Sequence, residues 1–370
     1  MKKSTILLLF TIVVFCGTTM HAQAQSSTFL VGTYTDASEQ GINQVSLDHK
    51  THALTLQKII SNVDNPSFIC TNKNKSIVVV VEETAGDQGG KITSYAITGA
   101  DYFTKRSTFF TKGSHPCTLA FSPDEHFIVV GNYSGGNVGV FPIDGFGILS
   151  EAVVTYQHTG ASENVSRQEK PHVHSVVFHP TENKIFIADL GNDTIEFIPF
   201  DSKTSSFLEV EKAIATKVPA GSGPRHLLFD AKGETLFATF ELSNQVGVYR
   251  FKNDKLQLIQ LAPITDSTKS GTAAEIKISK DNKFVYASVR GDDNLIAVYR
   301  WDSEQLTLIQ KVPTKKGPRN FIFTENEELA LVGSQFENSI SVYTRDKKTG
   351  LLTATQSELI INKPVYFSRF

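Results

Sequence analysis

The chain of 370 residues carries 36 basic and 38 acidic side chains, a formal charge of -2, and 40% of its residues are hydrophobic. This composition supports a substantial buried core and provides no general positive field for nucleic acid or anionic lipid. We therefore expect a globular protein whose partner is neither a nucleic acid nor a membrane.

The first 24 residues have the pattern of a secretory signal peptide. A basic pair, Lys2 and Lys3, precedes an apolar run over residues 6–14 and a small-residue cleavage motif at residues 22–24. The run is shorter than the roughly 20 residues that span a bilayer, and no later segment reaches that length. The sequence predicts cleavage after Ala24, export to the periplasm or the outside, and one mature domain over residues 25–370.

The cysteines do not indicate a disulfide framework. Cys16 falls within the signal peptide, where the bulky Phe15 before it disfavours the alternative of a lipoprotein anchor. Cys70 and Cys117 remain in apolar strand patterns, and neither belongs to a nucleophile motif. We expect two small buried side chains.

Short strand patterns, most of them containing an early proline, recur seven times along the mature chain. They are "NPSFIC" (65–70), "HPCTLAF" (115–121), "PHVHSVVF" (171–178), "GPRHLLF" (223–229), "TAAEIKI" (272–278), "GPRNFIF" (317–323) and "KPVYF" (363–367). A polar turn and three further strand patterns follow each of the middle copies. Four short strands per unit of about 50 residues are typical of a β-propeller blade. We predict an all-β fold, a seven-bladed β-propeller.

The two ends of the chain each carry part of one blade. Only three residues follow the seventh copy, whereas residues 29–35 ("FLVGTYT") open with the pattern of a second strand. We expect the C-terminal strand to join the N-terminal blade and close the ring, which leaves no free ring edge.

Equivalent residues of the blades become neighbours, because the first strand of every blade lines the central channel. Aligning the first strands gives one column with Ser67, Cys117, His174, Arg225, Ala274, Arg319 and Val365, and beside it a second column with His226, Glu275 and Asn320. The ends of the second strands give a column with Asn132, Asp189, Phe240, Val289 and Ser334, and beside it a column with Tyr133, Leu190, Glu241, Arg290 and Gln335.

From these columns we expect His174, Arg225, Glu241 and Arg290 to share one pocket. A histidine can take a proton from water, and arginines can bind an anionic substrate group or a developing oxyanion. Glu241 would hold these groups in place. The alternative is a set of channel salt bridges that only fills space. The candidate substrate-binding residues of the same channel are Asn132, Asp189, His226, Glu275 and Arg319.

No motif for a metal or another cofactor is found. His172 and His174 lie on one side of a strand and would suit two metal ligands, with Asp189 or Glu241 as the third, but no HxxxH or CxxC pattern accompanies them. The Gly-rich stretches "GDQGG" and "NYSGGN" lead into strands, whereas a phosphate-binding loop leads into a helix. We therefore predict no cofactor and no metal.

At these residues the chain resembles the seven-bladed propeller lactonase family, which includes bacterial 6-phosphogluconolactonases and fungal carboxymuconate lactonising enzymes. The resemblance covers nearly the whole mature chain and rests on the ordered motifs PHVH (171–174), DLG (189–191), GPRH (223–226), EL (241–242), AEI (274–276) and RG (290–291). It implies a hydrolase that opens a sugar-acid lactone in carbohydrate metabolism. It also implies that the catalytic residues are His174 or His172, Arg225, Glu241 and Arg290.

Two features depart from the family pattern. Phe240 and Val289 stand where the family usually has asparagine, so we expect a more apolar pocket rim. Export also separates the chain from 6-phosphogluconolactone, a cytoplasmic metabolite. A carboxymuconate-type cycloisomerase and a non-catalytic propeller that binds a glycan or protein are the alternatives, and the oligomeric state is left open.

Overall fold

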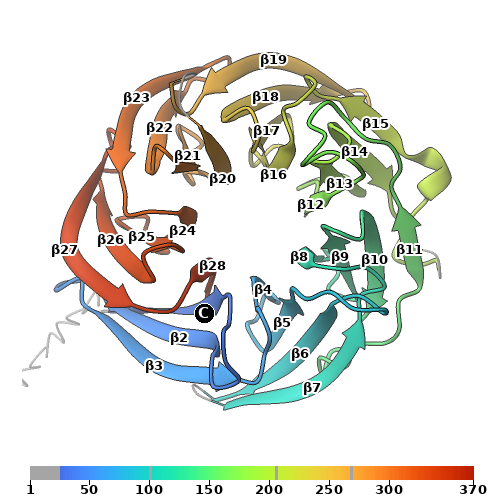
Figure 1. The fold of residues 1–370 in the computed structure, drawn as a ribbon, viewed down its shortest axis with the longest axis horizontal. Helices are drawn as coiled ribbons and strands as arrows, with labels where there is room; N and C mark the ends of the chain where they lie inside the picture. The colour runs from blue at the N-terminus through green and yellow to red at the C-terminus, as the bar shows by residue number, and fades with distance from the viewer. Residues whose placement is uncertain (1–25, 100–101, 205–206, 267–269) are drawn as a thin grey trace, which may run out of the picture.

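The computed structural model describes residues 26–99, 102–204, 207–266 and 270–370, and the predicted signal peptide lies outside them. Seven four-stranded antiparallel sheets surround a central axis (Figure 1). Helix within these ranges is limited to the 3₁₀ turn η1 (Val210–Lys212), and none of it has the length and hydropathy to cross a membrane. The prediction of an all-β, seven-bladed propeller is confirmed.

Each of the six blades that are continuous in sequence runs from an innermost to an outermost strand. The first three are β4 (Phe68–Thr71), β5 (Ile77–Glu82), β6 (Lys91–Thr98) and β7 (Tyr102–Phe110); β8 (Pro116–Phe121), β9 (Phe127–Asn132), β10 (Asn137–Pro142) and β11 (Val154–Gln157); β12 (Val173–Phe178), β13 (Lys184–Asp189), β14 (Thr194–Pro199) and β15 (Ile214–Lys217). The next three are β16 (Pro224–Phe229), β17 (Thr235–Phe240), β18 (Gln245–Lys252) and β19 (Lys255–Pro263); β20 (Gly271–Ile278), β21 (Phe284–Gly291), β22 (Leu295–Trp301) and β23 (Leu306–Pro313); β24 (Pro318–Phe323), β25 (Leu329–Ser334), β26 (Ser339–Arg345) and β27 (Leu352–Ile360).

The seventh blade combines the two ends of the chain, as predicted. Its order is β28 (Pro364–Arg369), β1 (Ser26–Thr33), β2 (Gly41–Asp48) and β3 (Leu54–Ser61). β28 pairs antiparallel with β1, placing Phe367 opposite Val31, and the Phe370 N–H donates to the carbonyl oxygen of Thr28 at 2.9 Å. The ring is therefore closed by hydrogen bonds between the first and last strands.

Apolar side chains fill the spaces between neighbouring blades. β5, "IVVVVE", is buried along its whole length, because both faces of each blade pack against an adjacent blade. One such cluster joins Val129 and Val138 of the second blade to Val173, Val176 and Ile187 of the third. The outermost β3 is exposed at most positions, since no further strand covers it.

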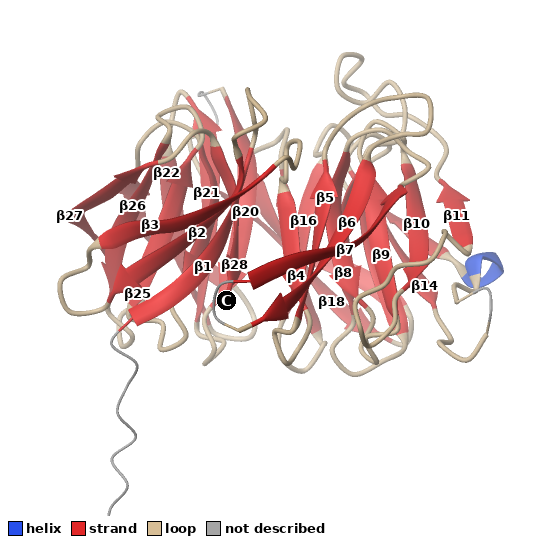
Figure 2. Ribbon diagram, turned by 90° about the horizontal axis from the view of Figure 1, so that it is seen from below, coloured by secondary structure: helices blue, strands red, loops and turns tan. Residues whose placement is uncertain are grey.

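The strand ends form two loop-covered faces, which Figure 2 shows above and below the blades. The turns after the second strands and the connections between blades lie on one of them, which we call the mouth face. The turns after the first and third strands lie on the other, the far face. The strand ends therefore decide which residues gather around either opening of the channel.

Candidate active site

A small cavity of about 10 Å³, which has room for roughly one water molecule, lies among the innermost strands and is lined by most of the predicted first column. Six residues of that column line it: Ser67, Cys117, His174, Arg225, Arg319 and Val365. The seventh, Ala274, contributes its carbonyl oxygen, which accepts a hydrogen bond from Arg225 Nη1 at 2.9 Å. The repeat alignment thus placed the first column correctly.

A β-bulge in the first strands aims these side chains into the channel. The register between the first and second strands shifts between Val173 and Ser175 and again between Pro318 and Asn320. His174 and Arg319 are the residues skipped by the pairing. An unpaired residue of this kind turns its side chain out of the normal alternation. The polar column therefore arises from the bulge at the start of each first strand, a position that the prolines mark in the sequence.

Glu241 is the centre of the polar cluster at the mouth face. It follows β17, and its Oε2 lies 2.8 Å from Arg225 Nε, 3.5 Å from Arg290 Nη2 and 3.8 Å from His174 Nε2. All four side chains are at least nine-tenths buried. The structure brings together the four residues that the columns and the family motifs selected.

The charges in this cluster shift the pKa values of its members. Burial alone would raise the pKa of Glu241, but Arg290 and Arg225 hold it well below its usual range. Burial and the adjacent Arg225 lower the pKa of His174 well below 6.5, although Glu241 opposes them. At neutral pH the cluster therefore contains a carboxylate, charged guanidinium groups and a neutral imidazole.

His172 stands beside His174 but has different partners. Its Nδ1 lies 3.1 Å from the carbonyl oxygen of Tyr133, and its Nε2 lies 3.3 Å from Glu169 Oε2. The ring stacks on that of Tyr133, which His174 meets edge-on. Both nitrogens of His172 thus face acceptors, whereas His174 Nε2 faces Glu241 without a close hydrogen bond.

His226 and Glu275 form a second buried pair next to Arg225. Nδ1 of His226 lies 3.2 Å from Glu275 Oε1, and its Nε2 lies 3.0 Å from Arg225 Nη1, so a neutral ring donates to the carboxylate and accepts from the guanidinium. Burial lowers the pKa of His226 to about 4. Burial would raise the pKa of Glu275, but Lys277 and His226 bring it to about 2. Asn320 Nδ2 also donates to Glu275. His226 and Glu275 are therefore placed to support Arg225.

Arg319 belongs to a group that the sequence pattern identified only in part. Its Nη2 donates to Tyr34 Oη at 2.9 Å, and that hydroxyl donates to the carboxylate of Glu83 at 3.0 Å. Tyr34 and Glu83 follow β1 and β5, as Glu241 follows β17. Extending the Tyr133–Glu241 column to the first and last blades would have found both.

The prediction that Asn132 and Asp189 line the channel is corrected by the structure. Asn132 donates to the carbonyl oxygen of Thr111 and to Asn137, away from the cavity. Asp189 accepts from the N–H groups of His172 and Gly191 and lies 2.9 Å from His158 Nδ1. At the ends of the second strands successive residues point to opposite faces, so Asn132 and Asp189 turn away from the channel, and the following residues Tyr133 and Leu190 do not share their direction.

The same alternation corrects the expected apolar rim. Phe240 and Val289 share the outward column with Asn132 and Asp189, and both are completely buried in the clusters between blades. Their side chains do not line the cavity. The substitutions therefore change the packing of the blades and leave the pocket polar.

Arg167 is a site residue that the repeat pattern did not predict. It lies in the connection between β11 and β12, outside the repeat, and its Nη2 donates to Glu241 Oε1 at 2.7 Å and to Tyr133 Oη at 3.1 Å. No periodic signal marks it, because the connection has no equivalent in the other blades.

The possible metal ligands are not gathered at one point. Among the residues with described positions, no group of three or more His, Cys, Asp or Glu side chains is arranged to hold a metal ion. Asp189 is occupied by its turn, and of the two histidines only His174 approaches Glu241. Cys117 lies 3.7 Å from His174 Nδ1, and burial strongly raises the pKa of its thiol, which makes it a poor nucleophile.

Known proteins share this architecture over nearly the whole chain. The family described as Lactonase, 7-bladed beta-propeller matches residues 28–368. The 6-phosphogluconolactonase of Bacillus subtilis is 31% identical over 347 residues, which cover 90% of this chain and 96% of the relative. The periplasmic gluconolactonase of Pseudomonas aeruginosa superposes with a TM-score of 0.86 at 28% identity, covering 93% of this chain and 99% of the other. A Bacteroides fragilis crystal structure gives a TM-score of 0.87 at 30% identity, covering 94% and 98%.

Proposed function

The chain belongs to the seven-bladed β-propeller lactonase family and is a lactone-hydrolysing enzyme, and on this premise we propose that its substrate is the lactone of a sugar acid. The supporting observation is the convergence of Arg225, Arg290 and His174 on Glu241 in the channel. Two guanidinium groups beside a neutral imidazole provide an oxyanion site next to a base. No cofactor is needed for this ester hydrolysis.

His174 suits the role of general base better than His172. Both ring nitrogens of His172 already lie against a protein oxygen, the carbonyl oxygen of Tyr133 at 3.1 Å and Glu169 Oε2 at 3.3 Å, and His172 does not line the cavity. His174 is neutral and lines the cavity. Its Nε2 lies 3.8 Å from Glu241 Oε2, which is too far for a hydrogen bond. We assign the base to His174.

The reaction follows from these positions. His174 takes a proton from water as the hydroxide adds to the lactone carbonyl carbon, and Arg225 and Arg290 stabilise the resulting oxyanion. The tetrahedral intermediate then breaks the ring carbon–oxygen bond, and the imidazolium returns the proton to the departing oxygen. Glu241 holds both arginines in place. The product is the open-chain sugar acid.

The pH dependence of the reaction should reflect the depressed pKa of His174. A base whose pKa is lowered stays unprotonated at a lower pH than an ordinary histidine, so activity persists below its usual titration range. We expect kcat/KM, corrected for spontaneous hydrolysis, to be level from about pH 8 to about pH 6 and to fall only below that. An acid limb near pH 7 or above would contradict the assignment.

A panel of lactones separates the proposal from its alternatives. The mature chain, residues 25–370, is assayed with glucono-lactone, 6-phosphoglucono-lactone and muconolactone, with and without a chelator. Hydrolysis of either sugar lactone in the presence of chelator is the expected result. Turnover of muconolactone alone would indicate a cycloisomerase, and no turnover at all would favour a binding protein.

The location of the enzyme is also part of the proposal. The basic, apolar and small-residue pattern of residues 1–24 supports export, and the similar Pseudomonas aeruginosa gluconolactonase is periplasmic. We therefore place the enzyme in the periplasm or outside the cell. N-terminal sequencing of the expressed protein should begin at Gln25.

A further inference from the structure

Arg167 differs from the other two arginines on Glu241. Arg225 and Arg290 are buried and also donate to backbone carbonyl oxygens of residues 272–274. The Arg167 side chain is 36% exposed, and its described bonds to Glu241 and Tyr133 both come from Nη2. The remaining N–H groups of its guanidinium are therefore suited to a ligand that enters from the mouth face.

The connection that carries Arg167, residues 159–171, is built against the third blade. Asp189 anchors both of its ends, because it accepts from the His172 N–H at 2.7 Å and lies 2.9 Å from His158 Nδ1. Within the connection, Ser162 donates to Asp193 Oδ2 and Gln168 donates to the carbonyl oxygen of Leu190. This support holds Arg167 in position before substrate arrives.

The charges around Glu241 favour the arrival of an anion. One carboxylate is surrounded by Arg167, Arg225 and Arg290, and Arg225 is already its close partner at 2.8 Å. Glu241 is buried but the Arg167 end of the pair is 36% exposed, so a second oxyanion can reach the Arg167 guanidinium from solvent. Tyr133 Oη accepts from Arg167 and keeps its own proton to donate.

We infer that Arg167 is a substrate-recognition residue that binds an oxyanion group, such as a phosphate ester, on the far end of the lactone. This assignment rests on the proposed function, since it places the lactone carbonyl at Arg225 and Arg290. The planar guanidinium binds phosphate through two parallel hydrogen bonds, and the buried arginines remain with the carbonyl oxygen. Arg167 thereby determines the preference for charged over neutral lactones.

The test compares an anionic lactone with its neutral counterpart. In Arg167→Gln, the ratio of kcat/KM for 6-phosphoglucono-lactone to that for glucono-lactone should fall roughly tenfold to a hundredfold, mainly through KM. Arg167→Lys keeps the charge without the fork and should give an intermediate ratio. Arg300→Gln, an exposed arginine on β22 that makes the same change in net charge, should keep the wild-type ratio.

Binding of the reaction products provides a readout that does not need turnover. Calorimetry should show tighter binding of 6-phosphogluconate than of gluconate to the wild-type protein, and Arg167→Gln should remove that difference. If the wild-type protein hydrolyses no lactone but Arg167→Gln still removes the difference in product affinity, the proposed function is overturned and the recognition site is retained. An unchanged preference in Arg167→Gln, or an equal loss for both lactones, would overturn the role of Arg167.

Discussion

Replacing Glu241 with glutamine is expected to reduce kcat/KM for lactone hydrolysis by about 100-fold to 1000-fold. The neutral amide cannot hold Arg225 and Arg290 together, and displaced oxyanion donors cost this much in comparable sites. The stability should fall by roughly 3–5 kcal/mol, because buried guanidinium groups lose their counter-charge. Initial rates well below the melting temperature, together with thermal unfolding curves, measure the two effects separately.

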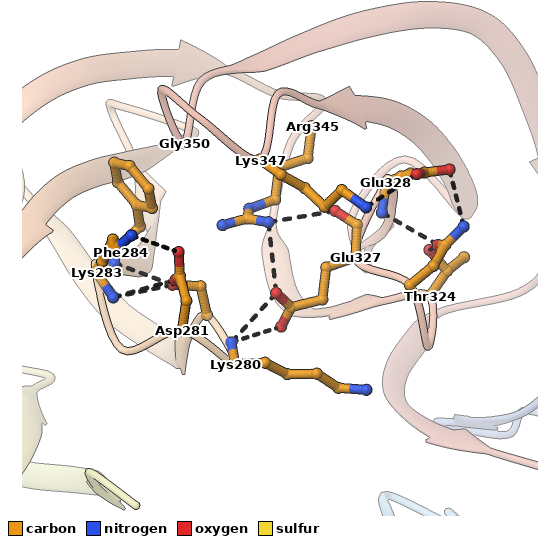
Figure 3. Close-up of polar contacts among 12 residues, drawn as sticks. Lys280, Asp281, Lys283, Phe284, Thr324, Glu327, Glu328, Arg345, Lys347 and Gly350 are labelled. Carbon is orange, nitrogen blue, oxygen red and sulfur yellow. Dashed lines mark hydrogen bonds and ion pairs between the residues drawn. The ribbon is translucent and has the colours of Figure 1, made fainter.

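Glu327 provides a matched control on the far face. Its Oε2 lies 3.4 Å from Nη1 of the buried Arg345, and its Oε1 accepts from the Lys280 N–H at 2.9 Å (Figure 3). Glu327→Gln removes a buried carboxylate from an arginine in the same way, so it should lower stability and keep hydrolysis. Wild-type rates in Glu241→Gln would refute the role of Glu241. Equal losses of rate in both variants would attribute the effect to folding.

The fold was predictable because its information is repeated. Each blade carries the same entry into its first strand, so the spacing of Pro116, Pro171 and Pro224 marks successive blades without knowledge of tertiary contacts. Closure was predictable because residues 363–367 carry a first-strand pattern that lacks its partner strands, and residues 29–35 carry a second-strand pattern that lacks a first strand before it. A fold without internal repeats would show neither the recurring strand pattern nor the split blade.

The site was predictable only where it follows the repeat. His174 and Arg225 share one position of the first strands, and Glu241 and Arg290 share one position at the ends of the second strands, so aligning the blades is enough to place all four around one opening of the channel. The same alignment included Asn132 and Asp189 wrongly, because it treated two adjacent strand positions as if both faced the channel.

Arg167 could not be predicted from the repeat. Its distance from Glu241 is set by the packing of residues 159–171 on the turn at Asp189–Asp193. Those contacts are specific to one blade and leave no periodic trace. A functional residue on a non-repeated connection therefore needs the three-dimensional structure to be found.

Deleting residues 363–370 is expected to prevent the chain from folding to a stable monomer. β28 supplies the innermost strand of the seventh blade, where Val365 and Phe367 are buried and Tyr366 stacks on Phe68 with ring centroids 4.0 Å apart. Removing one buried phenylalanine side chain costs about 3–5 kcal/mol, and the remaining losses bring the total to the size of an ordinary folding free energy. β1 would also become an open edge available for aggregation. Yield, circular dichroism and size-exclusion chromatography measure the result.

A circular permutant distinguishes loss of the strand from loss of the chain end. Phe370 lies beside Thr28, so a short turn can join residue 370 to residue 26, while new ends open in the exposed turn between Gly145 and Phe146. This chain keeps every strand and makes the β28–β1 pair a covalent hairpin. We therefore expect the permutant to hydrolyse lactones and to be at least as stable against unfolding as the parent. A stable truncated monomer would show that β28 is dispensable. An unfolded permutant would show that the natural ends, rather than the strand pairing, are what the ring requires.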